Sequence, residues 1–383
     1  MWYTCNIRFV KYFHKAFNVL SKTDPLQIDN EKKGVIIMKK ITAILLVILT
    51  MLMLAGCSTD IDLTDTLEDV VDITDTSEDL TEEDIVNELD SVIETIKTGE
   101  FTFDETYSDF ANDYYTMLDP YADSFYITEG GVYVLEGIYT STITIDAGDE
   151  DVDLVLVNAT ISSTSGPAIL VLSGDEITIS APPTTVNVIE DTYNHQLIDD
   201  EDYNAAIYSK SDLVFNGTGT LTVNGYYNNA INCRDDIKIV DITLNITSID
   251  DGIIGKDYIA VRDAVITADT DGDSLKSTND EDLSKGFIYI ESGTFDLTSG
   301  ADAIQAENDI IIYDGTFNID TGDDGIASTG SISIGNGTFT FNCDGDGINS
   351  DAEIFIYDGD FTMSVGDDAI HGYDLIQIEG GTI

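Results

Sequence analysis

The chain has 383 residues and a formal net charge of -57, because it carries 73 acidic but only 16 basic side chains. A surface this acidic repels nucleic acids and anionic lipid head groups, which excludes a nucleic-acid-binding function. It attracts cations, so binding of an acidic polymer would require a bridging metal ion.

The first predicted element is a lipoprotein signal peptide at residues 38–57. Met38-Lys39-Lys40 is its basic start, and the apolar run 41–54 is too short and one-sided for a dependable membrane span. The run ends in Leu54-Ala55-Gly56-Cys57, which resembles the bacterial lipobox, so Cys57 is expected to carry the lipid. A chance cysteine in an ordinary signal region is the alternative. The prediction is an exported protein, lipid-anchored to the bacterial cell membrane and facing outside, that meets the membrane only through this anchor.

Two further segments flank this signal peptide. Residues 1–37 precede Met38, and we interpret them as an over-extended N-terminus; a genuine cytoplasmic extension is the alternative. Residues 58–125 hold 22 acids and one base, which is typical of a solvated acidic linker. Within it, apolar residues at helical spacing follow an acidic first turn and predict a short helix near residues 81–97.

Beyond the linker, a short phrase repeats: a carboxylate or amide, a small residue, then an aliphatic residue that we call the anchor. Successive anchors lie 22 residues apart, except for one step of 29. A repeat of this length without a helical pattern predicts a solenoid in which each repeat forms one coil and neighbouring coils bury each other's apolar side chains. The anchors are Ile231, Ile253, Leu275, Ile304, Ile326, Ile348 and Ile370.

Short alternating strands and glycine turns complete each predicted coil, as in Ile310-Ile311-Ile312-Tyr313 before Gly315. The prediction is an all-β parallel β-helix over residues 126–383, with about 22 residues per coil. Nine residues before four anchors stands a phenylalanine, and we expect these side chains to stack in the core. They are Phe295, Phe317, Phe339 and Phe361.

Earlier coils are less regular. Ile169 and Ile207 match degenerate anchors, and the 38 residues between them predict a projecting loop that contains Pro182-Pro183 and Tyr193-Asn194-His195. Cys233 and Cys343 occupy different phases of the repeat, so they are expected to be buried single thiols. The chain stops in the middle of a coil, which predicts that further C-terminal coils and a cap are missing from this sequence.

Acidic residues gather at the corner beside the anchors and are the predicted metal ligands. Stacking would place equivalent carboxylates about 4.8 Å apart, where like charges repel unless a cation lies between them. Calcium suits such a site because it accepts six to eight oxygen ligands in a tolerant geometry. The alternative is that these aspartates only serve the turns by bonding their own backbone. The candidates are Asp250, Asp251, Asp271, Asp273, Asp302, Asp323, Asp324, Asp346, Asp367 and Asp368.

A family resemblance rests on two stretches. Asp250 to Ile259 and the run Lys276 to Asp282, which is also the seven-residue insertion, resemble the bacterial carbohydrate-binding β-helix lipoproteins; the likeness spans about residues 127–383. The resemblance implies a right-handed parallel β-helix with bound calcium, similar to calcium-dependent pectate lyases but binding its polysaccharide rather than cleaving it. It also implies attachment at the cell surface to cellulose or polygalacturonate.

Signatures of conventional catalysis are absent from the sequence, and His195 and His371 are too isolated to form a zinc site or a Ser-His-Asp set. A calcium-dependent lyase would need a basic side chain to remove the C5 proton, and Lys276 is best placed for that role. A lysine among carboxylates is a poor base, however, because its charged form is favoured.

For sugar binding we expect Tyr226 and Tyr227, with Lys256 and Lys276 as basic contacts. Tyr313 and Tyr357 also recur two coils apart at one phase, with Gly335 between them. The sequence therefore predicts a monomeric surface lipoprotein that binds a pectin-like or cellulosic polysaccharide through a calcium-bearing β-helix without cleaving it. A calcium-dependent polysaccharide lyase and a structural surface adhesin are the alternatives.

Overall fold

The computed structural model of the chain describes residues 115–383, apart from residues 123, 199–200 and 283. The described residues form strands and turns and contain no helix. Accordingly, this part of the chain includes no helix that is long and apolar enough to cross a membrane. The predicted signal peptide, Cys57 and the helix near 81–97 lie outside the described residues.

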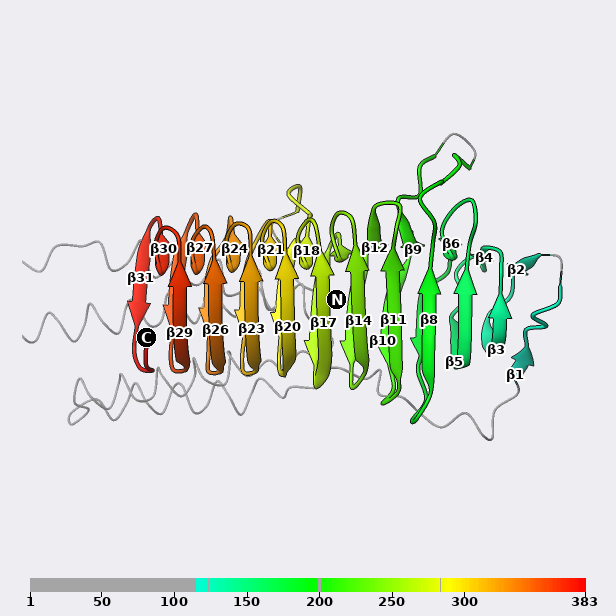
Figure 1. Cartoon of the computed structure of the whole chain (residues 1–383), viewed down its shortest axis with the longest axis horizontal. Helices are drawn as coiled ribbons and strands as arrows, with labels where there is room; N and C mark the ends of the chain where they lie inside the picture. The colour runs from blue at the N-terminus through cyan, green and yellow to red at the C-terminus, as the bar shows by residue number, and fades with distance from the viewer. Residues whose placement is uncertain (1–114, 123, 199–200, 283) are drawn as a thin grey trace, which may run out of the picture. The chain divides into compact units, whose positions relative to one another are not determined.

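One side of every coil belongs to an 11-stranded parallel sheet, which we call the anchor sheet (Figure 1). Its strands are short, and each coil contributes one of them. They are β2 (Phe125–Ile127), β4 (Ile143–Asp146), β6 (Ile169–Ser173), β9 (Ala205–Ser209), β12 (Asn229–Cys233), β15 (Ile253–Gly255), β18 (Leu275–Ser277), β21 (Ile304–Ala306), β24 (Ile326–Ser328), β27 (Ile348–Ser350) and β30 (Ile370–Gly372).

The other two sides belong to a 20-stranded sheet with two columns of strands. The first column follows the anchor sheet in each coil and contains β7 (Glu176–Ser180), β10 (Asp212–Asn216), β13 (Asp236–Val240), β16 (Tyr258–Arg262), β19 (Phe287–Ile290), β22 (Ile310–Ile312), β25 (Ile332–Ile334), β28 (Glu353–Ile356) and β31 (Leu375–Ile378). The second column contains β3 (Gly131–Tyr139), β5 (Val152–Ser162), β8 (Val186–Glu190), β11 (Thr220–Gly225), β14 (Thr243–Ser248), β17 (Ala264–Thr270), β20 (Gly293–Ser299), β23 (Thr316–Thr321), β26 (Thr338–Cys343) and β29 (Asp360–Val365). β1 (Tyr115–Met117) belongs to the first column, because it pairs with residues 132–134 of β3, the part of β3 that continues through β5 to β7.

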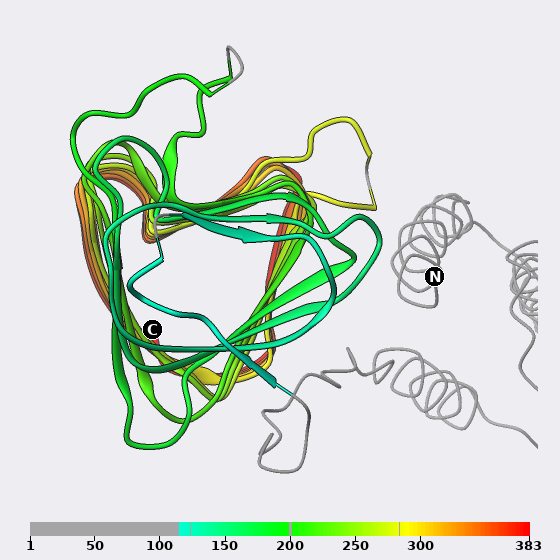
Figure 2. The same cartoon turned by 90° about the vertical axis from the view of Figure 1, so that its right-hand side faces the viewer.

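The long strand β5 joins the two columns, because it pairs with β7 through residues 152–155 and with β8 through residues 160–162. Seen along the axis in Figure 2, the later coils superimpose on three sides. Strand β1 pairs in parallel with β3, so the sheet also includes residues that precede residue 126. The predicted all-β parallel solenoid is thus confirmed.

The anchor register is confirmed strand by strand. Ile231 pairs with Ile253, which pairs with Leu275, and the same column continues through the remaining anchors to Ile370. The predicted degenerate anchors continue the same column, since Ile169 pairs with Ile207 and Ile207 with Ile231. Burial of these aliphatic side chains from one coil to the next is the main favourable term for stacking.

Two insertions leave the regular coil and project from it in Figure 2. One connects β18 to β19; the other, at residues 191–204, connects β8 to β9. The insertion predicted at residues 276–282 begins later than expected, because Lys276 and Ser277 pair in register within β18. The prediction for the second loop was wrong in one respect. Pro182 and Pro183 do not belong to it, because they lie in the tight turn between β7 and β8, where the Thr185 N–H donates to the Pro182 carbonyl at 3.2 Å.

The phenylalanine stack is confirmed inside the solenoid. Phe295, Phe317, Phe339 and Phe361 stack with centroids 4.5, 4.6 and 4.7 Å apart and nearly parallel rings. The turn before each ring requires glycine. At Gly315, for example, φ is 151° and an added Cβ would lie 2.7 Å from the Phe317 ring. Cys233 and Cys343 are buried and free, as predicted.

Removing one ring from the stack should destabilise the solenoid strongly. We expect Phe339→Ala to cost about 3–5 kcal/mol, because it deletes buried surface and leaves a cavity between two stacked rings. Thr340→Ala, on the exposed face of the same strand, is the matched control. Urea unfolding followed by circular dichroism measures both. Equal midpoints for the two variants would contradict the assignment of the stack to the core.

Candidate functional site

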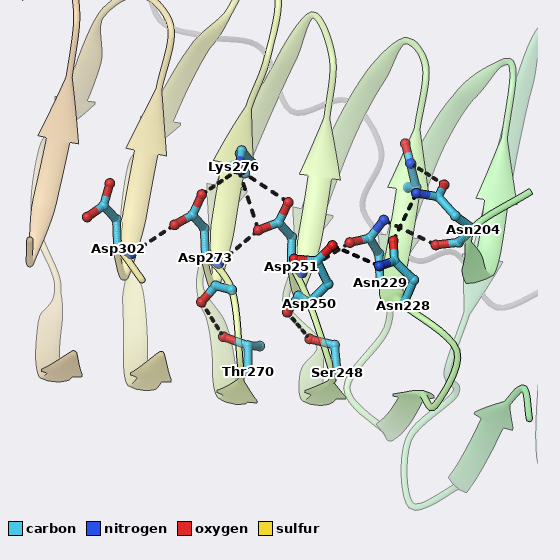
Figure 3. A network of polar contacts seen from close by, with 12 residues as sticks. Asn204, Asn228, Asn229, Ser248, Asp250, Asp251, Thr270, Asp273, Lys276 and Asp302 are labelled. Atoms are coloured by element: carbon cyan, nitrogen blue, oxygen red, sulfur yellow. Dashed lines mark hydrogen bonds and ion pairs between the residues drawn. The ribbon is translucent and has the colours of Figure 1, made fainter. Parts of the chain in front are cut away.

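A column of carboxylates lies at the corner where the second column of strands turns into the anchor sheet; Figure 3 shows part of it. We call it the aspartate ladder: Asn229, Asp251, Asp273, Asp302, Asp324, Asp346 and Asp368. Each of the first six members, from Asn229 to Asp346, uses its Oδ1 to accept the backbone N–H of the equivalent residue in the next coil. From Asn229 to Asp368 these N···Oδ1 distances are 3.0, 2.9, 2.8, 2.9, 2.6 and 2.7 Å.

These hydrogen bonds differ from the turn bonding that is the alternative to metal binding. The side chains bond backbone, but it is the backbone of the neighbouring coil rather than of their own turn. A carboxylate that accepts a backbone N–H is fixed in direction. The ladder therefore leaves the second oxygen, Oδ2, of each aspartate available for other partners.

We call each member of the ladder a rung. On several rungs the second oxygen, Oδ2, contacts the side chain 25 residues later in the sequence, which we call its cap. Asn349 Nδ2 donates to Asp324 Oδ2 at 2.7 Å, and His371 Nδ1 lies 3.2 Å from Asp346 Oδ2. Lys276 does the same for two rungs, because its Nζ lies 3.3 Å from Asp251 Oδ2 and 2.7 Å from Asp273 Oδ2 (Figure 3). The buried pair Asp251 and Asp273 thus shares one ammonium group, which offsets one of their two negative charges.

The protonation of Lys276 bears on the lyase alternative. Burial alone would lower the pKa of its ammonium, but the hydrogen bond and charge of Asp273, together with Asp251, raise the pKa overall. A lysine that holds its proton more tightly than usual is a poor general base. The geometry therefore gives Lys276 a charge-neutralising role in the ladder.

One rung lacks a cap. The residue 25 positions after Asp302 is Ala327, whose methyl group cannot donate a hydrogen bond. Around this rung, Asp302, Asp323 and Asp324 each offer an oxygen, all within 4.8 Å of one another. Burial, followed by the charges of Asp273, Asp324 and Asp323, raises the pKa of Asp302 to about 7. Carboxylate oxygens gathered in this way are the donor set that a hard cation such as calcium prefers.

The other predicted ligands are distributed around this group. Asp346 and Asp368 converge with His371 in another set of three candidate ligands, and this histidine was not suggested as a ligand by the sequence. Asp250 accepts a hydrogen bond from Asn228 at 2.8 Å. Asp271 and Asp367 are exposed, and neither joins a group of three ligands among the described residues.

The predicted sugar-binding residues lie at different positions along the coil, with Tyr226 and Tyr227 before β12, Lys256 after β15 and Lys276 within β18. Tyr226 and Tyr227 are half-buried against the loop 191–204, where Tyr226 lies 5.6 Å from the ring of Tyr193 and Tyr227 stacks on His195 at 4.2 Å. Both rings therefore pack against this loop, which the sequence did not indicate. Lys256, also half-buried, follows β15, and its N–H donates to the Cys233 carbonyl at 3.0 Å.

Each of the two histidines contacts an aspartate, which the sequence did not indicate. His195 Nε2 lies 3.0 Å from Asp191 Oδ2, and both side chains are almost fully buried. His195 Nδ1 lies 3.0 Å from the Tyr203 carbonyl, and Asp191 Oδ1 accepts the Tyr226 N–H at 2.6 Å. The i,i+4 spacing of Asp191 and His195 was a weak signal in the sequence for this pair.

A second acidic group, which the sequence reasoning missed, lies at the opposite end of the anchor sheet strands. Oxygens of Asp212, Asp235 and Asp236 lie within 4.8 Å of one another. Burial, then the charges of Asp212 and Asp235, raises the pKa of Asp236 to about 8; burial and the charge of Asp212 raise that of Asp235 to about 6. We call these three residues the second acidic group.

The loop between β18 and β19 contacts the coil next to the second acidic group. Asn279 Nδ2 donates to Asp257 Oδ1 at 2.6 Å, and Lys285 forms an ion pair with the same carboxylate. Asp257 occupies the position one coil after Asp235, since the Asp257 N–H donates to the Asp235 carbonyl at 3.3 Å. The repetition of Asp235 and Asp257 at 22 residues was visible in the sequence, but their three-dimensional neighbours were not.

The second acidic group should make stability depend on pH in a defined direction. Its folded-state pKa values of about 6 and about 8 lie above the ordinary aspartate value. The folded state therefore binds these protons more tightly, and the stabilisation is complete below about pH 4 and lost as pH rises through the folded-state values. In EDTA, we expect the Tm to fall between pH 5 and pH 9.

Asp236→Asn should reduce this fall by a few degrees, because the amide mimics the neutral acid. Exposed Asp149→Asn is the control, and differential scanning calorimetry across the pH range is the measurement. A profile for Asp236→Asn parallel to that of the control would contradict the assignment.

Comparison with known proteins agrees with a sugar-binding solenoid. The family described as carbohydrate-binding domain-containing protein matches residues 122–383. A relative of that description from Acetivibrio thermocellus is 28% identical over 190 residues, which cover 49% of this chain and 66% of the relative. A solved structure of a polysaccharide lyase-like protein from C. thermocellum, a gadolinium derivative, is 25% identical with a TM-score of 0.48, over 67% of this chain and 89% of that one. Because the family match extends over more than half of the sequence and contains every strand from β2 to β31, the chain belongs to the carbohydrate-binding domain-containing proteins.

Proposed function

We propose that the protein is a surface lipoprotein that binds an acidic, pectin-like polysaccharide through calcium held on its solenoid, without cleaving the polymer. The observation that carries the proposal is the uncapped rung of the aspartate ladder, where Asp302, Asp323 and Asp324 converge. Family membership supports the polysaccharide as the partner.

Charge is the reason that a metal ion enters the proposal. With a formal charge of -57, the protein would repel a polyuronate chain at any distance where the charges are not screened. Calcium bound to Asp302, Asp323 and Asp324 would supply positive charge that uronate carboxylates can share. The three aspartates would hold the ion, while the Oδ1 bonds to the backbone would keep the ladder in place.

The state of Lys276 supports binding rather than cleavage. Removal of the C5 proton of a uronate needs a base that is unprotonated at working pH. Lys276 is bonded to Asp273 and Asp251, which favour its charged form, and it already serves as their counter-ion. A bound chain would therefore meet an ammonium group that can orient a carboxylate.

Retention on immobilised polygalacturonate tests the calcium part of the proposal. We expect retention in calcium, loss of retention in EDTA, and a weakening of at least about tenfold for the double variant Asp302→Asn with Asp324→Asn. These amides keep the Oδ1 acceptor for the ladder but remove negative charge from the site. Exposed Asp250→Asn is the matched control. Equal retention in calcium and EDTA would contradict the proposal.

The same incubation separates binding from cleavage. A lyase would release unsaturated products, so the ultraviolet absorbance of their double bond would rise with time in calcium. We expect no rise. A steady increase that disappears in Lys276→Ala would establish the lyase alternative, whereas no retention on any glycan would favour the structural adhesin.

Lipid attachment at Cys57 is proposed from the sequence alone. In a bacterial host, the full chain should incorporate labelled palmitate and fractionate with membranes, and Cys57→Ser should do neither. Cys5→Ser, outside the lipobox, is the control. Membrane fractionation of Cys57→Ser equal to that of the control would contradict the anchor.

A further inference from the structure

A second apolar cluster lies outside the solenoid core, on the outer face of the anchor sheet. Leu170 of β6 and Tyr208 of β9 are paired neighbours, and each follows the inward-facing anchor of its strand by one residue. Because side chains alternate along a strand, both point outward. They are nevertheless only 2% and 8% exposed. Another segment must therefore cover them.

The loop 191–204 supplies this cover. The Tyr203 ring packs edge-on against Tyr208 with centroids 4.9 Å apart, and Ile198 packs against the same cluster. We call residues 191–198 the strap. The cluster is separate from the solenoid core, so its burial depends on the strap remaining closed.

His195 lies at the centre of the contacts that hold the strap. Its Nδ1 lies 3.0 Å from the Tyr203 carbonyl oxygen, and its Nε2 lies 3.0 Å from Asp191 Oδ2. The side chains of His195 and Asp191 are 1% and 0% exposed. The imidazole also stacks on the ring of Tyr227 with centroids 4.2 Å apart.

The two polar contacts together require a proton on both ring nitrogens. A carbonyl oxygen and an ionised carboxylate only accept hydrogen bonds, and a neutral imidazole has one nitrogen that also only accepts. Without the second proton, a nitrogen lone pair would face an oxygen in a buried site, which is unfavourable. Among the described residues, His195 Nε2 and Asp191 Oδ2 have no hydrogen bond, so their contact is an ion pair that depends on the charge of the imidazole.

The surroundings favour a charged imidazole opposite an ionised carboxylate. Asp191 Oδ1 accepts the N–H groups of Tyr226 and Tyr227 at 2.6 and 3.3 Å, which stabilises the carboxylate. The stacked face of Tyr227 attracts a cation. Lys210 is paired with Glu201 at 2.7 Å. The other titratable groups around the pair are Glu190, Tyr193, Asp202, Tyr203, Tyr226 and Tyr227.

We propose that the strap is a pH-operated cover on the outer face of the anchor sheet, closed while His195 is protonated and released when His195 loses that proton to solvent. Histidine ordinarily changes its charge between about pH 5 and pH 8. The closed strap makes contacts that need this proton and an open strap does not, so closure is favoured at the acidic end of the range and lost as pH rises. Release exposes Leu170 and Tyr208. The inference concerns neither calcium nor the polysaccharide, so it does not rest on the proposed function.

The ring ¹⁵N chemical shifts of His195 report its protons directly. They are recorded on the full chain labelled with ¹⁵N-histidine, and the signals are assigned with His14→Gln and His371→Gln. We expect protons on both ring nitrogens of His195 at about pH 5.5 and on one of them at about pH 8. A single ring proton throughout this range would overturn the proposal, and this measurement needs no variant of the strap.

Hydrogen exchange, corrected for the intrinsic effect of pH, measures closure of the strap and of the Tyr226 amide. We expect protection to fall about tenfold between about pH 5.5 and about pH 8. His195→Gln, whose side chain cannot become charged, should give low protection at both pH values. His371→Gln removes the contact with Asp346 at a side chain that is 52% exposed, and this matched control should keep the wild-type profile.

The outcomes isolate the strap from the rest of the solenoid. Equal protection of the wild-type strap at the two pH values would overturn the proposal, as would identical profiles for the wild type and His195→Gln. An equal fall of protection in the coils after β19 would also overturn it, because release of the strap is local. Circular dichroism of His195→Gln should match that of the wild type, since the strap lies outside the solenoid core.

Discussion

The parallel register between coils is the constraint on which the rest of the structure depends. Because each regular coil has the same length, identical positions lie above one another, and every property of a residue is repeated along the axis. Apolar repetition is favourable, as in the stacked rings of Phe317 and Phe339. Charged repetition is unfavourable unless it is compensated, and the aspartate ladder shows several forms of compensation side by side.

Those forms are physically different. The backbone N–H of the next coil compensates one oxygen of each aspartate from Asp251 to Asp346, as between Asp324 and Asp346 at 2.6 Å. The second oxygen is compensated by an ammonium at Lys276, by an amide at Asn349 and by an imidazole at His371. At Asp302 the residue in the position of the cap, Ala327, offers only a methyl group, so a proton or a bound cation would have to supply the compensation. This difference between rungs, rather than acidity as such, distinguishes the proposed cation site.

Much of the fold could be predicted because the period is written directly in the sequence. The anchors, the phenylalanine stack and the free cysteines all follow from position within a repeat, and the structure confirms them. The contacts of the early coils were harder to predict, since the loop 191–204 interrupts the period. The Asp191–His195 pair belongs to this loop and was not predicted. Pairs of that kind depend on the path of a non-repeating segment, which no spacing rule describes.

The candidate site was predictable only in part, for a related reason. The sequence identified the column of aspartates, but not that Oδ1 would bond the next coil or that Oδ2 would face a residue 25 positions later. Without that geometry, the sequence does not indicate that Ala327 occupies the position from which other side chains cap the ladder. The second acidic group was missed because Asp212, Asp235 and Asp236 belong to coils of unequal length, so their convergence leaves no regular spacing.

The most direct measurement of the central claim is calcium titration of the wild type and Ala327→Asn by isothermal calorimetry. An asparagine at position 327 would cap Asp302 as Asn349 caps Asp324. The account predicts that the wild type binds calcium at this rung and that Ala327→Asn loses one binding site while its Tm in EDTA is equal or higher. Identical stoichiometry and affinity in the two proteins would contradict it.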